Sequence, residues 1–171
     1  MIKLFWTSLL MLAAWACPGA GECRGLTGAE RATLLAMAAE SDAHWDAADA
    51  GKLAAMFAPD ADFRLADRVA FDSREGILDY FTRSFAGRPA GMHHVTEIVA
   101  LREVAPGVVM ADGHVRLERE TADGGRELLR RFVNHTLVVR EGEGWRFKAL
   151  RAHPLPVGAP SAQAAAPAVG S

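Results

Sequence analysis

Acid and imidazole side chains are the groups in this sequence that could move protons. Asp46 lies near the end of a segment with helical periodicity, whereas His94 and His114 lie in segments that alternate like β-strands. A carboxylate held against an imidazole can act as a general base or can orient the ring. If the fold brings Asp46 to one of these histidines, the pair could transfer a proton on a small molecule. If it does not, Asp46 is a solvated carboxylate like Asp42 and Asp49.

The strand histidines leave a choice of face open. Successive strand residues point to opposite faces, so only one of His93 and His94 can face inward. His114 shares a face with Arg116, and an inward pair would give a pocket a titratable base and a fixed cation. An outward pair would be surface or interface groups. Periodicity does not decide between these alternatives.

Other side chains could contact a substrate. Only one of Asn134 and His135 can face inward, and an inward asparagine could hydrogen-bond a hydroxyl or carbonyl. Trp45 precedes Asp46 and fits a core or pocket wall. Phe63 alternates with polar residues on a short strand, which also fits a pocket wall.

Several classes of function lack their signatures. The formal net charge is −2 and the arginines are scattered, so we expect no nucleic-acid partner. Glycine-rich phosphate loops are absent, so we expect no nucleotide cofactor. Metal-binding spacings of histidine and cysteine are also absent, and we assign no metal ligand.

Both ends of the chain differ from the middle. Lys3, the apolar run 4–16 and its Ala-x-Ala end predict a signal peptide within residues 1–22, although a retained anchor is the alternative. The protein would then be periplasmic or secreted, without a membrane partner after processing. Cys17 and Cys23 fall around the cleavage region, and their fate depends on the cleavage site. Residues 154–171 form an Ala/Pro-rich segment that predicts a disordered tail, which leaves one domain over 27–153.

The order of the predicted elements indicates an α+β fold. Thr27 and Glu30 form a capping box that begins the first helix. Helices come first and strands joined by short turns follow, which is typical of an antiparallel meander beside a helical layer. The predicted helices cover 27–50, 52–57 and 73–85, and the predicted strands cover 61–65, 93–102, 108–120, 127–140 and 145–153.

One strand also bears on the oligomeric state. Residues 137–139 are Leu-Val-Val and are therefore apolar on both strand faces. Burial of both faces would follow if the outer face of the sheet packed against a second copy. We therefore expect a homodimer, although apolar strand centres also occur in monomers.

Several motifs resemble those of a known family. The helix pair over 45–61 and the short pieces 74–77, 93–95 and 144–147 occur in the same order as in the nuclear transport factor 2-like superfamily, in its SnoaL-like or scytalone-dehydratase-like branch. The resemblance implies a cone-shaped barrel, with three N-terminal helices packed on a curved mixed or antiparallel sheet that encloses a pocket. This fold hosts both enzymes and non-catalytic binding modules.

The resemblance also implies a site. It favours His94 over His93 and Asn134 over His135. Asp46, His94, His114 and Asn134 together are similar to the residues around the substrate in scytalone dehydratase. That enzyme uses tyrosines to hold a water, and this sequence departs from it because its only tyrosine is Tyr80, on the third predicted helix. The implied function is cofactor-independent dehydration, isomerisation or cyclisation of a small apolar molecule, by a lyase or isomerase. The alternative is a ligand-binding or dimerisation module of the same fold.

Overall fold

The computed structural model describes residues 25–66 and 69–156. The predicted signal peptide, Cys17, Cys23 and the tail from residue 157 lie outside the described residues. The helices are α1 (Gly28–Asp46), α2 (Ala50–Ala55) and α3 (Arg74–Ala86). The strands are β1 (Phe57–Leu65), β2 (Val69–Phe71), β3 (Met92–Ala105), β4 (Val108–Glu120), β5 (Arg126–Glu141) and β6 (Gly144–Leu155). Among the described residues, no helix is both long and apolar enough to cross a membrane.

Helix α1 begins as the sequence predicts and ends earlier. The side chain of Thr27 accepts the backbone N–H of Glu30, whose carboxylate accepts the backbone N–H of Thr27, so the capping box is confirmed. The helix ends at Asp46 because Ala48 takes a left-handed conformation, with φ of 55°. Asp49 then accepts the N–H of Lys52 and begins α2 as its N-cap.

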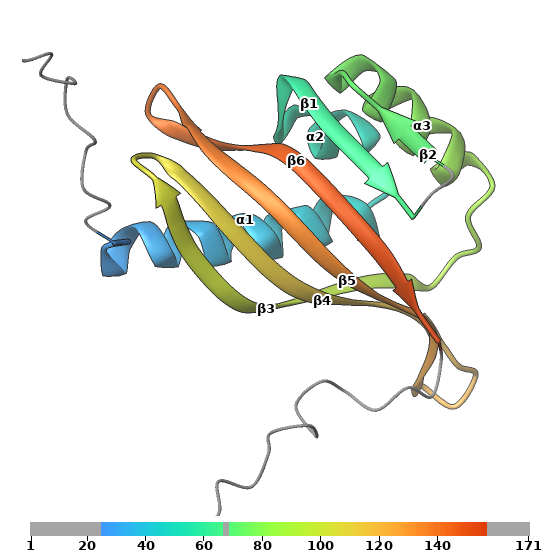
Figure 1. The fold of residues 1–171 in the computed structure, drawn as a ribbon. Coiled ribbons are helices and arrows are strands. Elements are labelled where there is room, and N and C mark those ends of the chain that lie inside the picture. The colour runs from blue at the N-terminus through green and yellow to red at the C-terminus, as the bar shows by residue number, and fades with distance from the viewer. Residues whose placement is uncertain (1–24, 67–68, 157–171) are drawn as a thin grey trace, which may run out of the picture.

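The six strands form one open mixed sheet in the order β2-β1-β6-β5-β4-β3. Strands β3 to β6 form the predicted antiparallel meander, whereas β1 pairs with β6 in parallel. Figure 1 shows α1 crossing the concave side of the strongly twisted sheet, with α2 and α3 beside β1 and β2. The α+β fold with a helical layer on a curved sheet is therefore confirmed.

Three strand boundaries differ from the expectation by more than one residue, and one of them is the end of β3, which lies at Ala105 instead of residue 102. Strand β1 starts at Phe57, before Pro59, and its pairing with β6 shifts register between Phe57 and Asp62. A proline is tolerated at such an irregularity because no regular ladder hydrogen bond is lost there. Strand β6 continues to Leu155, two residues beyond the expected end of the domain.

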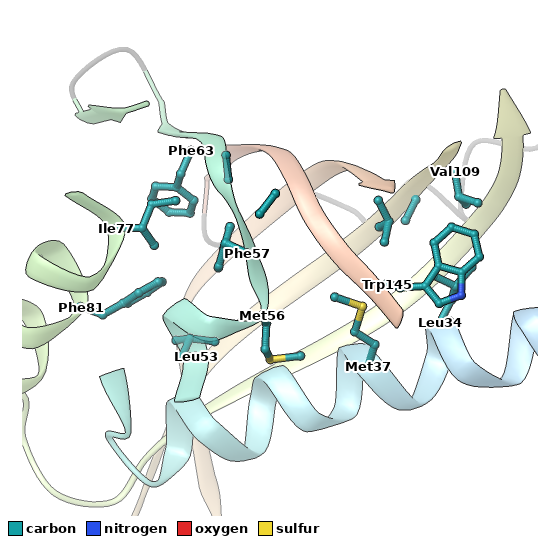
Figure 2. Packing of buried hydrophobic residues seen from close by; sticks show 14 residues of the cluster. Leu34, Met37, Leu53, Met56, Phe57, Phe63, Ile77, Phe81, Val109 and Trp145 are labelled. Atoms are coloured by element: carbon teal, nitrogen blue, oxygen red, sulfur yellow. The ribbon is translucent and has the colours of Figure 1, made fainter. Parts of the chain in front are cut away.

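The hydrophobic core lies between the helices and the concave side of the sheet. Phe57, Ile77 and Val109 are completely or almost completely buried. Figure 2 shows Leu34 and Met37 on α1 facing the sheet, near Trp145. Part of this interior is left open, and that space forms the candidate site.

Candidate active site

A cavity of about 290 Å³ lies between the helices and the concave face of the sheet. Ser41 and Trp45 of α1 line one wall, and residues of β3 to β6 line the facing wall. Most of the lining side chains are aliphatic or aromatic. The polar groups that do face the cavity are therefore the ones that could do chemistry there.

His94 and Asp42 form a hydrogen-bonded pair at this cavity. Nδ1 of His94 lies 2.5 Å from Oδ1 of Asp42, and both side chains are about one-fifth exposed. Thr96 completes the arrangement, because its N–H and its hydroxyl both donate to the Asp42 carboxylate, each at 2.7 Å. An ionised Asp42 places the ring proton on Nδ1 of His94, which leaves Nε2 as the basic nitrogen.

Asp46, one helical turn later, makes a second pair at the rim. Its Oδ1 accepts the backbone N–H of His94 at 2.7 Å, and its Oδ2 lies 2.8 Å from Nδ1 of His93. Nε2 of His93 lies 3.1 Å from Glu120. The hydrogen bond to Asp46, followed by the one to Glu120, raises the pKa of His93.

The two aspartates also fix how α1 lies along the edge strand. They accept the outward-facing N–H groups of His94 and Thr96, which no neighbouring strand can pair. Four helical residues advance by about 6 Å, which matches the advance of two strand residues. The distance between the two aspartates on α1 therefore matches the distance between the two N–H groups on β3. Their side chains satisfy backbone donors that the edge strand would otherwise leave unpaired.

Arg88 and Trp45 close the helical end of the cavity. Arg88 donates from Nη1 to the carbonyl of Trp45 at 2.5 Å and from Nη2 to that of Asp46 at 2.8 Å. Its guanidinium lies 4.2 Å from the centre of the Trp45 ring and 4.9 Å from that of Phe85. Burial lowers the pKa of Arg88. The Trp45 indole also lies against His94, with ring centres 5.4 Å apart, and so holds the imidazole in place from a second side.

The sheet wall carries a polar atom with no partner. Oδ1 of Asn134 is buried and receives no hydrogen bond from the residues that the structure describes. Such an unpaired acceptor costs about 1–3 kcal/mol. Tyr80 and Phe63 line the cavity as well, with ring centres 5.7 Å apart.

Comparison with known families identifies the family of the chain. Residues 29–151 match the sequence model of the SnoaL-like domain. The chain belongs to this family. A comparison with curated protein sequences gives no match.

Solved structures share the fold of this SnoaL-like domain. A Nostoc punctiforme domain of unknown function with a cystatin-like fold aligns with a TM-score of 0.67 at 19% identity, over 77% of this chain and 81% of that one. A candidate scytalone dehydratase from Novosphingobium aromaticivorans gives 0.65 at 18% identity, over 75% and 85%. ActVI-ORFA from Streptomyces coelicolor gives 0.65 at 21% identity, over 75% and 98%.

Four of the expected site residues lie at the cavity of the SnoaL-like domain. Trp45, Phe63, His94 and Asn134 all line it. His93 and His135 do not, so the face of each pair that the resemblance favours is the one that faces inward. Their roles in binding or catalysis remain predictions.

Two expected residues, His114 and Arg116, lie on the opposite face of the sheet. Their strand neighbours Gly113 and Val115 line the cavity, so the expectation of an inward pair is wrong. Arg116 instead donates to Glu118 at 2.9 Å. A register shift between β3 and β4 lies in β3, between Ile98 and Ala100, and leaves the alternation of β4 intact.

The expectation for the acid that pairs with the inward histidine is also wrong. Asp46 was expected to pair with a cavity histidine, yet its side chain binds His93, and Asp42 binds His94. The four-residue spacing of Asp42 and Asp46 placed both on one helix face and was the available signal. Arg88 follows α3 in a loop, where no motif marks it.

Proposed function

We propose that this protein is a cofactor-independent enzyme of the lyase or isomerase class that transfers a proton on a small apolar substrate. The observation that carries the proposal is that His94, which lines a mostly apolar cavity, is hydrogen-bonded to Asp42 behind it. Asp42 orients the ring and stabilises the imidazolium that forms when Nε2 takes a proton. Membership of the SnoaL-like family supports this function, as does the shared fold of the candidate scytalone dehydratase.

Dehydration of a β-hydroxy carbonyl compound fits a single cavity base. Nε2 of His94 takes the proton from the carbon next to the carbonyl, and the electrons of that bond form the new double bond. The bond to the hydroxyl group breaks, and the imidazolium returns its proton to the departing oxygen, so that water leaves. In an isomerisation the same proton returns to a different carbon. Asn134, at the opposite wall, would hold a hydroxyl or carbonyl group of the substrate.

A second function is a binding module without chemistry. The mostly apolar lining favours it, because such a cavity holds an apolar ligand without any proton transfer. The two functions differ in what happens when His94 changes. Loss of turnover with retained binding indicates an enzyme, whereas retained binding without turnover in any variant indicates a binding module.

The chain offers a matched control for the test. Nδ1 of His135 lies 2.7 Å from Oδ1 of Asp112 on the outer face of the sheet, in a second Asp–His pair outside the cavity. His94→Gln and Asp42→Asn should each lower turnover by about a hundredfold or more. His135→Gln and Asp112→Asn should leave it unchanged.

The assay begins with the ligand recovered from natively purified protein and identified by mass spectrometry. Small cyclic β-hydroxyketones test dehydration by the absorbance of the enone product, and β,γ-unsaturated ketones test isomerisation. Equal rates for His94→Gln and wild type would overturn the catalytic role of His94. If the wild type shows no turnover and His94→Gln keeps the ligand affinity, the protein is a binding module.

We also propose that the protein is exported, on the signal-peptide pattern of residues 1–22. N-terminal sequencing of protein from the native host should find a first residue near Cys17 to Glu22. Full-length protein recovered from the cytosol would contradict export.

A further inference from the structure

Two arginines are the permanent charges among the described residues that line the cavity. Arg88 and Arg130 line it, whereas none of its described lining residues is an aspartate or glutamate. Asp42 and Asp46 lie behind the wall, and their carboxylates are hydrogen-bonded to residues of β3. The permanent charges that a molecule in the cavity would meet are therefore positive, and such charges attract anions.

Arg130 is the cation that is available to a ligand. It forms no hydrogen bond or ion pair with the described residues, although it lies on a strand rich in paired arginines. Arg126 on the same strand binds Glu118, and Arg119 on the neighbouring strand binds Glu127. Arg88 differs, because its two terminal nitrogens already donate to the last carbonyls of α1.

The strand register places Arg130 level with the candidate base. Arg130 pairs with Leu117, and Leu117 pairs with His94. All three side chains face the cavity. Two strand spacings separate the Cα atoms of Arg130 and His94 by roughly 10 Å. A ring system that spans the cavity could therefore reach both residues.

We propose that the substrate is a small alicyclic or aromatic carboxylic acid, whose carboxylate is bound by Arg130 while its reacting carbon lies at Nε2 of His94. A guanidinium binds a carboxylate through two parallel N–H···O bonds, which fixes orientation as well as position. The rest of the molecule would contact the apolar lining. This inference rests on the proposed function in taking this cavity as the substrate site and His94 as its base.

A pair of probes with matched shape tests the charge alone. The probes are 2-naphthoate and its neutral counterpart 2-naphthamide, with binding measured by calorimetry at low salt and neutral pH. The wild type should bind naphthoate about tenfold more tightly, as expected for one charge-assisted pair. Raising the salt to 1 M should reduce this preference, since screening weakens exposed ion pairs.

The variants assign the preference to one residue. Arg130→Gln should bind both probes equally and keep the wild-type affinity for the amide. Arg131→Gln removes the same charge one residue along, on the opposite face of β5, and should keep the tenfold preference. Circular dichroism checks that both variants fold.

Three results would overturn the proposal. They are equal binding of the two probes by the wild type, binding of neither probe, and a preference that persists in Arg130→Gln but disappears in Arg88→Gln. Because binding is measured without turnover, this result is independent of the proposed chemistry. The binding test can reject the role of Arg130 while His94→Gln still abolishes turnover. It can also support Arg130 while His94→Gln leaves turnover unchanged.

Discussion

The imidazole of His94 is hydrogen-bonded to Asp42, which lies one helical turn before Asp46. The two aspartates bind different groups of the same strand, β3. Asp42 takes the side chain of His94 and both donors of Thr96. Asp46 takes the backbone of His94 and the side chain of His93. Both carboxylates therefore anchor α1 to β3, but only Asp42 also binds the imidazole that faces the cavity.

This division predicts unequal effects of two isosteric changes. Asp42→Asn should lower turnover by about a hundredfold or more, because the neutral amide no longer fixes the ring proton on Nδ1. Asp46→Asn should have a much smaller effect. The double variant Asp42→Asn/His94→Gln should cost little more than either single change, because the two residues act as a unit. A larger loss in Asp46→Asn than in Asp42→Asn would contradict the assignment.

His93 predicts a pH dependence of stability. Its hydrogen bonds to Asp46 and Glu120 raise its pKa in the folded state. A raised pKa means that the stabilisation is complete below the unfolded value, about 6.5, and is lost as the pH rises through the higher folded value. In urea unfolding, His93→Gln should therefore be most destabilised relative to wild type below about pH 6, and the difference should shrink above neutrality. An NMR titration of His93 at or below the ordinary histidine value would exclude this linkage.

Arg88 should contribute to stability more than its neighbours. Arg88→Met leaves the carbonyl of Asp46 without its donor and removes one of the two donors to the carbonyl of Trp45, which should cost about 1–3 kcal/mol. Arg83 is a suitable control, because its pair with Asp79 is exposed and its atoms are 4.0 Å apart. Arg83→Met should change the free energy of unfolding by less than about 0.5 kcal/mol. Denaturant unfolding compares the two, and equal losses would contradict the capping role of Arg88.

Asn134 should show opposite effects on stability and binding. Asn134→Leu removes a buried acceptor that has no partner among the described residues, so stability should stay the same or rise by about 1 kcal/mol. The affinity for the natively recovered ligand should fall, because the variant offers no polar group at this wall. His135→Leu changes the next residue, which does not line the cavity, and should leave affinity unchanged. A clear loss of stability in Asn134→Leu would show that the amide is satisfied in the folded protein.

The homodimer remains a prediction. Val138 is buried in the core, with 2% exposure, while Leu137 lies on the outer face of the same strand. Light scattering should show a dimer at micromolar concentration, and Leu137→Arg should give a monomer. Val104→Arg, at an exposed position near the end of β3, should stay dimeric. A monomeric wild type would exclude the dimer.

The sequence predicts the elements better than their relative positions. The Thr27–Glu30 capping box and the alternation of β4 are local signals, and both appear in the structure. The face of β4 that carries His114 depends on which side the helices cover, which alternation alone does not determine. The choice between Asp42 and Asp46 depends on the position of α1 along β3. Tertiary contacts set that position, and the periodicity of the sequence does not indicate it.

The sequence also fails to predict the shortest strand and the strand pairing between the most distant segments. Strand β2 has three residues, too few for a pattern to emerge. The parallel pairing of β1 with β6 joins segments near the two ends of the domain, and a meander of neighbouring strands gives no hint of it. These are the contacts for which local sequence carries least information.

That same pairing has a consequence for the order in which the molecule can assemble. Phe57 lies opposite Phe147, so β1 lacks its main partner until nearly the entire domain has left the ribosome or crossed a membrane. Strand β1 is therefore only partly covered, by β2 and the helices, until β6 is present, which favours slow folding and makes the incomplete chain prone to aggregate. A chain that stops before β6 would contain all three helices but would lack the part of the cavity wall formed by Phe147, Leu150 and Ala152.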